Sequence, residues 1–265
     1  MIMNSGYDES IWKEVYREFS SERYFQGTVF RNKKIINEFV KFVKPEDGPI
    51  LDVGAYRGYN SFTLNLMGYC VNAIDVLTVI NEHSIALHYT KRNIPFRSYK
   101  VGQGQRIPAD AESYAGALVV EVLEHLQVNP MYLFFELERV LLPGGYVILT
   151  TPNQVRLRGR IKVLFGHSMN DDCSSFFKKF DSHKYFDDTG YHWKLYTLHE
   201  VKKLAVAAGL QVVSAKYQWM PVASQGSFVE LMIRNIERTI GIGIPSCRDW
   251  LVFIIRKKKS YYTGN

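Results

Sequence analysis

Acidic side chains stand at two points of this sequence where a short apolar run ends. Asp52 is followed by Gly54 and Gly58, and a second run ends at Asp75. A strand that passes through glycines into a helix turns the first backbone N–H groups of that helix toward a ligand. Asp75 lies 21 residues after Gly54, close to the separation at which an acid binds ribose hydroxyls. The pair predicts a nucleotide-type site; an ordinary strand–helix turn, with Asp75 as a helix N-cap, is the alternative.

A second group of chemically competent residues follows a later apolar run. Residues 116–120 lead directly into Glu121, Glu124 and His125, and His192 lies further along the chain. Histidine is the natural proton acceptor near neutral pH. We therefore predict His125 and His192 as candidate catalytic bases, with a structural or helix-capping histidine as the alternative for each.

The elements that position these residues alternate along the chain. Apolar runs predict strands at 50–54, 71–75, 96–101, 116–121 and 145–151, and helices are expected between them at 59–67, 79–92 and 130–141. This alternation is typical of an α/β fold with a doubly wound parallel sheet and helices on both faces. Two further β-rich runs are at 210–217 and 250–256, and an amphipathic helix is predicted at 29–43.

Four motifs in this order carry a resemblance to a known family. They read LDVGAYRG (51–58), EVLEHL (121–126), LPGG (142–145) with TPN (151–153), and GYHWKLYT (190–197) before AGL (208–210). Together they resemble the class I S-adenosylmethionine-dependent methyltransferases, over roughly residues 35–215. The resemblance implies a seven-stranded, mostly parallel sheet whose last strand pair is antiparallel.

The resemblance also implies roles for individual residues. Asp52 would hold the amino acid end of the cofactor, directly or through water, and Asp75 would bind its ribose. The remaining positions implied to line the cofactor site are Gly54, Ala55, Tyr56, Gly58, Val76, Gln103, Gly104 and Glu121. Tyr56, Arg57, Gln103 and Ala115 depart from the usual family residues.

Three segments are expected around this site. Residues 1–45 are interpreted as an N-terminal helical cap, in which positions 12, 16 and 19 share one helix face. Residues 46–152 and 191–259 form the S-adenosylmethionine-binding domain. Residues 153–190 do not fit the alternation and are interpreted as a lid-like insertion after the fifth strand, on the substrate side.

The resemblance implies methyl transfer to a small or carrier-linked acceptor, and we expect O-methylation of a sugar, lipid or polyketide-type hydroxyl. The loop lacks the G-x-G-x-x-G pattern of nicotinamide dehydrogenases. No separate RNA-binding module is apparent, which disfavours a nucleic-acid partner. An RNA methyltransferase and a non-catalytic, partner-binding protein of the same fold remain the alternatives.

Composition and charge indicate where the protein acts and which ions or surfaces it contacts. Three scattered cysteines show no pairing or metal-ligand spacing, and no metal site is predicted. No secretory signal or membrane-spanning run is visible, so a cytoplasmic location is expected. The net charge of +7 is concentrated in part at 154–165, where basic and apolar residues alternate. That segment motivates a hypothesis of peripheral contact with an anionic membrane surface.

Overall fold

Seven strands form one sheet in the computed structural model, which describes residues 9–102, 104–170, 191–220 and 228–259. The strand order is β3-β2-β1-β4-β5-β7-β6. The first five strands in the chain pair in parallel, and β7 is antiparallel to both β5 and β6. The predicted doubly wound sheet with an antiparallel last pair is therefore confirmed. Strand bounds are β1 Ile50–Val53, β2 Val71–Asp75, β3 Phe96–Ser98, β4 Tyr114–Val120, β5 Leu141–Pro152, β6 Gln211–Gln218 and β7 Trp250–Arg256.

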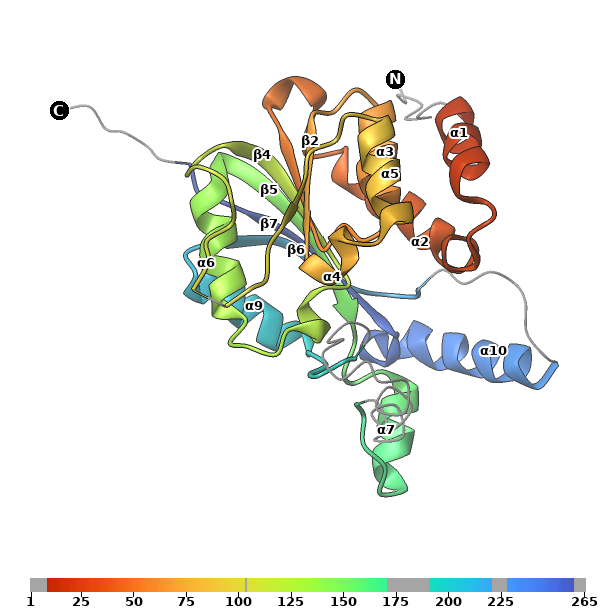
Figure 1. Ribbon diagram of the computed structural model, residues 1–265. Helices are drawn as coiled ribbons and strands as arrows, with labels where there is room; N and C mark the ends of the chain where they lie inside the picture. Colours follow the sequence, from red (N-terminus) through yellow and green to blue (C-terminus); the bar gives the residue numbers. More distant parts are fainter. Residues whose placement is uncertain (1–8, 103, 171–190, 221–227, 260–265) are drawn as a thin grey trace, which may run out of the picture.

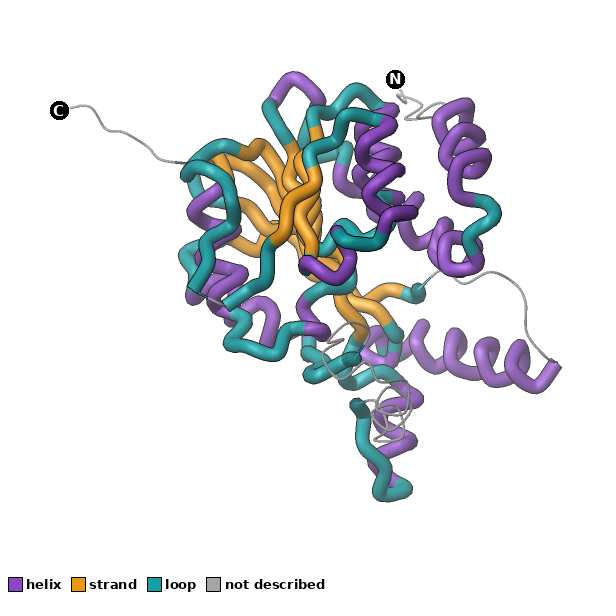
Figure 2. Tube along the Cα trace, viewed as in Figure 1, coloured by secondary structure: helices purple, strands orange, loops and turns teal. Residues whose placement is uncertain are grey.

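Helices cover both faces of this sheet (Figures 1 and 2). One layer contains α1, α2, α3 and α5, and the other contains α6 and α9. Both α7 and α10 extend beyond the carboxyl ends of the parallel strands (Figure 1). Helix bounds are α1 Glu9–Phe19, α2 Arg23–Phe39, α3 Tyr59–Leu66, α4 Leu77–Ile80, α5 His83–Lys91, α6 Met131–Val140, α7 Leu157–Leu164, α9 Leu198–Ala207 and α10 Phe228–Gly243.

The central strands are buried on both faces because helices pack on each side. All four residues of β1 are buried, as are the first six of β4. Successive side chains of a strand point to opposite faces, so Ile50 packs in the core beneath α2 and α3 while Leu51 packs beneath α6. Two apolar cores therefore hold the strand ends, and the loops that follow them, in fixed positions.

The N-terminal helices belong to the first of these cores. Both α1 and α2 contact α3, and Trp12, Val15 and Phe19 are buried. Of the three positions predicted to share one helix face, Trp12 and Phe19 are buried, whereas Tyr16 is 40% exposed. The predicted helix 29–43 begins earlier, at Arg23, and ends at Phe39.

Two further departures concern single segments. The predicted helix 79–92 is two helices, α4 and α5, which a turn at residues 81–82 separates. The long helix α10, between the last two strands, was not predicted. Residues 157–164 of the proposed lid form α7, whereas 171–190 lie outside the described residues. Within the described chain no helix has the length and apolarity that crossing a membrane requires.

Candidate functional site

The loop after β1 passes close to its neighbours because of two glycines. Gly54 has φ +69° and Gly58, the N-cap of α3, has φ +83°, a region that other residues rarely adopt. A Cβ atom on Gly54 would lie 2.4 Å from Cγ2 of Val122, and one on Gly58 would lie 3.0 Å from Cζ of Tyr89. Only glycine therefore lets this loop run beside the end of β4.

Asp75 connects the end of β2 to this loop. Its Oδ2 accepts a hydrogen bond of 2.7 Å from the backbone N–H of Tyr56, and its Oδ1 accepts one of 2.7 Å from that of Val76. Burial raises the pKa of Asp75, although both of these bonds oppose the shift. The hydroxyl of Tyr89 donates to the Tyr56 carbonyl at 3.0 Å. Two predicted cofactor residues, Asp75 and Tyr56, therefore lie in direct contact.

Asp52 lies inside the protein rather than at its surface. Its side chain is 1% exposed, and its Oδ2 accepts a 2.6 Å hydrogen bond from the Ser61 hydroxyl of α3. Burial raises the pKa of Asp52 to about 7, against the opposing effect of this hydrogen bond. The carboxylate thus fixes the start of α3 below the glycine loop, and its contact with a cofactor stays a prediction.

Glu121 follows β4 in a strained conformation and connects three elements. Its φ is +55°, which is uncommon outside glycine and marks a constrained position. Its Oε1 accepts hydrogen bonds of 2.9 Å from the Thr150 hydroxyl and from Nε1 of Trp250. Its Oε2 lies 3.4 Å from Nη1 of Arg31 in α2. The ion pair places α2 against the carboxyl end of β4.

Arg31 is a candidate site residue that sequence reasoning missed. It is buried, and its Nε has no hydrogen-bond partner among the described residues. A buried N–H group without a partner is costly, so this atom is poised to bind an acceptor. No local spacing pointed to it, because its partner Glu121 is 90 residues away in the chain.

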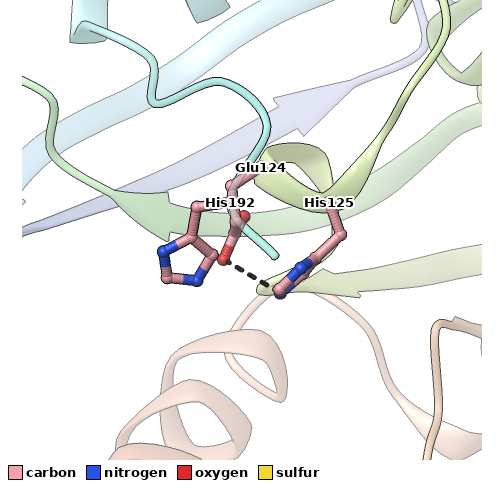
Figure 3. Close-up of side chains that lie close together, drawn as sticks. All are labelled: Glu124, His125 and His192. Atoms are coloured by element: carbon pink, nitrogen blue, oxygen red, sulfur yellow. Dashed lines mark ion pairs between the residues drawn. The ribbon is translucent and has the colours of Figure 1, made fainter. Parts of the chain in front are cut away.

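Both predicted histidines lie beside the same strand end (Figure 3). His125 belongs to a short 3₁₀ turn, Leu123–His125, and its ring centroid is 5.0 Å from that of His192. Glu124 lies between them and is 1% exposed. Burial raises the pKa of Glu124 well above its usual range, and the charge of Glu121 adds to that effect.

The remaining predicted cofactor residues are less closely grouped. Ala55 donates its backbone N–H to the Ile74 carbonyl at 3.2 Å, and Val76 is the N-cap of α4. Gly104 is exposed with φ +71°, and no contact within the described part of the chain places it with the other site residues. Gln103 lies outside the described residues. The structure thus brings together Gly54, Tyr56, Asp75 and Val76 on one side, and Glu121, Glu124, His125 and His192 on the other.

The fold and this arrangement agree with a match to a protein family. The profile of a family described as "Methyltransferase domain" matches residues 23–215, which is most of the chain. The chain belongs to this family, the class I S-adenosylmethionine-dependent methyltransferases, and S-adenosylmethionine is its cofactor. Among curated proteins no significant match exists.

Solved structures share the fold at low sequence identity. A chain from the complex between the Haloferax volcanii Trm112 methyltransferase activator and a candidate methyltransferase is 14% identical, with a TM-score of 0.56 over 92% of this chain and 97% of that one. Haemonchus contortus phosphoethanolamine N-methyltransferase 2, in complex with S-adenosyl-L-methionine, is 15% identical with a TM-score of 0.56; the match covers 97% of this chain and 59% of that one. The [4+2]-cyclase SpnF is 15% identical, with a TM-score of 0.53 and 86% and 81% coverage. Because proteins with different activities share this fold, the methyl acceptor has to be inferred from the residues of the site.

Proposed function

We propose that this chain transfers a methyl group from S-adenosylmethionine to a hydroxyl of a small or carrier-linked molecule, such as a sugar, a lipid or a polyketide. The observation that supports the hydroxyl is the pair of imidazoles, His125 and His192, beside the end of β4. A hydroxyl keeps its proton at neutral pH and needs a base, whereas an uncharged amine is already nucleophilic.

The residues present fit the cofactor. The glycine loop offers backbone close to the ends of β1 and β2, and the Asp75 carboxylate there is suited to accept hydrogen bonds from ribose hydroxyls. Arg31 and Glu121 form an adjacent pair of opposite charges, which matches the carboxylate and ammonium groups of the methionyl end. When bound, the cofactor supplies an electrophilic methyl group on a sulfonium.

His125 is oriented to act on an acceptor hydroxyl. Its Nδ1 lies 2.7 Å from the carbonyl oxygen of Tyr191. A carbonyl only accepts, so Nδ1 carries the hydrogen of this bond, and Nε2 of the neutral ring keeps its lone pair. That nitrogen would accept the hydroxyl proton, so that the acceptor oxygen could take the methyl group that the bound cofactor supplies.

An acceptor panel tests this proposal. Sugars, lipid alcohols and phenols are offered beside amines of matched carbon skeleton, and release of S-adenosylhomocysteine is measured. We expect turnover with at least one hydroxyl compound and none with its matched amine. Turnover with amines alone would contradict O-methylation and leave methyl transfer intact. Turnover with RNA alone would favour the RNA methyltransferase alternative.

The exposed end of α7 supports a proposal about where the enzyme works. Leu164 is 82% exposed and Phe165 76% exposed, and Lys162 lies in the same last turn. The neighbouring cations are partly engaged, because Arg158 pairs with Glu237 of α10 and Arg160 donates to Ser246. We propose that the apolar tip, more than the basic residues, inserts into the surface of an anionic membrane.

Co-sedimentation with vesicles tests this membrane contact. We expect binding to anionic vesicles at low salt that falls as salt screens the charges. The double variant Leu164→Ser and Phe165→Ser should lose most of the bound fraction. Val206→Ser, at a 64% exposed position on α9, is the matched control and should bind as the unaltered protein does. Absence of binding by the unaltered protein at low salt would contradict the proposal.

A further inference from the structure

Three potential metal ligands meet beside β4 (Figure 3). Each of Glu124, His125 and His192 offers one ligand atom, and these atoms all lie within 4.8 Å of one another. Two imidazole nitrogens and one carboxylate oxygen form a donor set that suits first-row transition metals such as Zn²⁺. The histidines come from distant segments, so the fold itself assembles the set.

The Glu124 carboxylate supplies an independent observation that points to a cation ligand. Its Oε2 accepts a 2.8 Å hydrogen bond from the Thr151 hydroxyl. Its Oε1 has no hydrogen-bond partner among the residues that the structure describes. Nε2 of His125 lies 3.9 Å from this oxygen, which is too far for a hydrogen bond. A carboxylate oxygen buried in this way is costly unless a cation compensates it.

Backbone contacts hold both histidines in place around that oxygen. The bond from Nδ1 of His125 to the Tyr191 carbonyl directs the lone pair of Nε2 away from the backbone and toward Glu124. Metal-binding histidines are held in this way by a hydrogen bond from their other nitrogen. The N–H of Trp193 donates to the Glu124 carbonyl at 2.8 Å, which keeps the neighbouring residue His192 beside the same turn.

We propose that Glu124, His125 and His192 bind a divalent transition-metal ion, and that this ion takes the acceptor hydroxyl as a further ligand. The second part rests on the proposed function. Three protein ligands leave at least one position open, as in catalytic metal sites. The hydroxyl proton then passes to water rather than to His125, while the O–CH₃ bond forms, the S–CH₃ bond breaks and sulfur keeps the electron pair. In this case His125 acts as a metal ligand. The hydrogen bond from its Nδ1 to the Tyr191 carbonyl still orients Nε2.

The site needs only a small closure to bind an ion. Metal–ligand bonds of about 2.1 Å place ligand atoms roughly 3.4 Å apart. The three ligand atoms lie within 4.8 Å of one another, so each pair has to approach by about 1.4 Å at most. The His125 side chain is 30% exposed, and His192 is also partly exposed. Both rings are therefore partly accessible to solvent, from which an ion could reach them.

Metal titration of the full-length protein tests the site without any acceptor. After treatment with EDTA, the protein is titrated calorimetrically with Zn²⁺, and Co²⁺ is added separately to record its visible absorption. We expect one Zn²⁺ per chain with micromolar or tighter affinity, and a Co²⁺ band typical of nitrogen and oxygen ligands. Glu124→Gln keeps an acceptor for Thr151 and removes the charge; it should weaken Zn²⁺ binding at least tenfold, as should His192→Ala.

His199→Ala, at an exposed position on α9, is the matched control and should leave Zn²⁺ affinity unchanged. Zn²⁺ binding that is equal in the unaltered protein, Glu124→Gln and His192→Ala would overturn the site, and so would no binding at all. S-Adenosylhomocysteine titration of the same EDTA-treated protein separates the two proposals. Cofactor binding without a metal site overturns only this inference. A metal site without cofactor binding overturns the proposed methyl transfer and, with it, the acceptor hydroxyl as a ligand, and leaves the metal site itself standing.

Discussion

Alanine at His125 should lower the rate of methyl transfer at least 100-fold and leave the affinity for S-adenosylhomocysteine nearly intact. Loss of a group that handles a proton in the transition state costs about 10²- to 10⁴-fold. His125 contacts Tyr191 and lies near Glu124, whereas the cofactor loop is held by Asp75 and Tyr89. The loss should therefore appear in kcat. Rates are measured with the hydroxyl acceptor that the panel identifies, and affinity by calorimetry.

His192→Ala should lower turnover in the same way, because its ring lies beside that of His125. His199→Ala serves again as the control and should keep full activity. A role as proton acceptor and a role as metal ligand both predict these losses, so zinc titration decides between them. Unchanged rates in both His125→Ala and His192→Ala would rule out a function for these imidazoles.

Gly54→Ala should reduce cofactor affinity more than tenfold, which corresponds to about 1.4 kcal/mol. The new Cβ atom would lie 2.4 Å from Cγ2 of Val122, and the backbone would keep φ +69°. The left-handed conformation costs a non-glycine residue roughly 1–2 kcal/mol. Relief of both strains moves the loop away from β4, where the proposed cofactor site lies. Calorimetry with S-adenosylhomocysteine measures the loss, and circular dichroism verifies the fold.

The control variant Gly209→Ala shows the effect of the left-handed backbone conformation alone, without a contact like that between a Cβ on Gly54 and Val122. Gly209 follows α9 with φ +82°, and no atom lies within 4 Å of the position of an added Cβ. This variant should lose about as much stability from its backbone conformation as Gly54→Ala does, and it should keep its cofactor affinity. A folded Gly54→Ala protein that binds S-adenosylhomocysteine as tightly as Gly209→Ala does would show that the loop is not part of the cofactor site.

The sheet and the cofactor loop could be predicted because their signals are local. A parallel strand that is buried on both faces appears in the sequence as a continuous apolar run. β4 has this form, and β1 and β2 have it apart from Asp52 in β1 and Asn72 and Asp75 in β2. Gly54 and Gly58 stand directly after such a run. The position of Asp75 follows from the length of one strand–helix–strand unit, which varies little.

Contacts between distant segments could not be predicted in this way. His192 is 67 residues from His125, and one of the bonds that join their segments runs from the Trp193 N–H to the Glu124 carbonyl. Neither sequence spacing nor apolar periodicity encodes that bond, so the sequence predicted two separate bases and no metal site. The ion pair between Arg31 and Glu121 was missed for the same reason.

Helix α10 was missed for a different reason. It lies between β6 and β7, which pair directly with each other, and the resemblance to the family implied only that this last strand pair is antiparallel. The helix is inserted in the connection between these strands and reaches α7 through the ion pair of Arg158 and Glu237. An insertion of this kind leaves the strand pairing unchanged, so the sheet was predicted correctly while its connection was not.

Calorimetric titration with S-adenosylhomocysteine tests the central claim most directly, with Asp75→Ala beside the unaltered protein and Asp110→Ala, at an exposed acid, as the control. All three proteins are first freed of co-purified ligand. We expect micromolar binding by the unaltered protein and by Asp110→Ala, and at least tenfold weaker binding by Asp75→Ala. No binding by well-folded protein, or equal binding by all three, would contradict a cofactor site built on the glycine loop and Asp75.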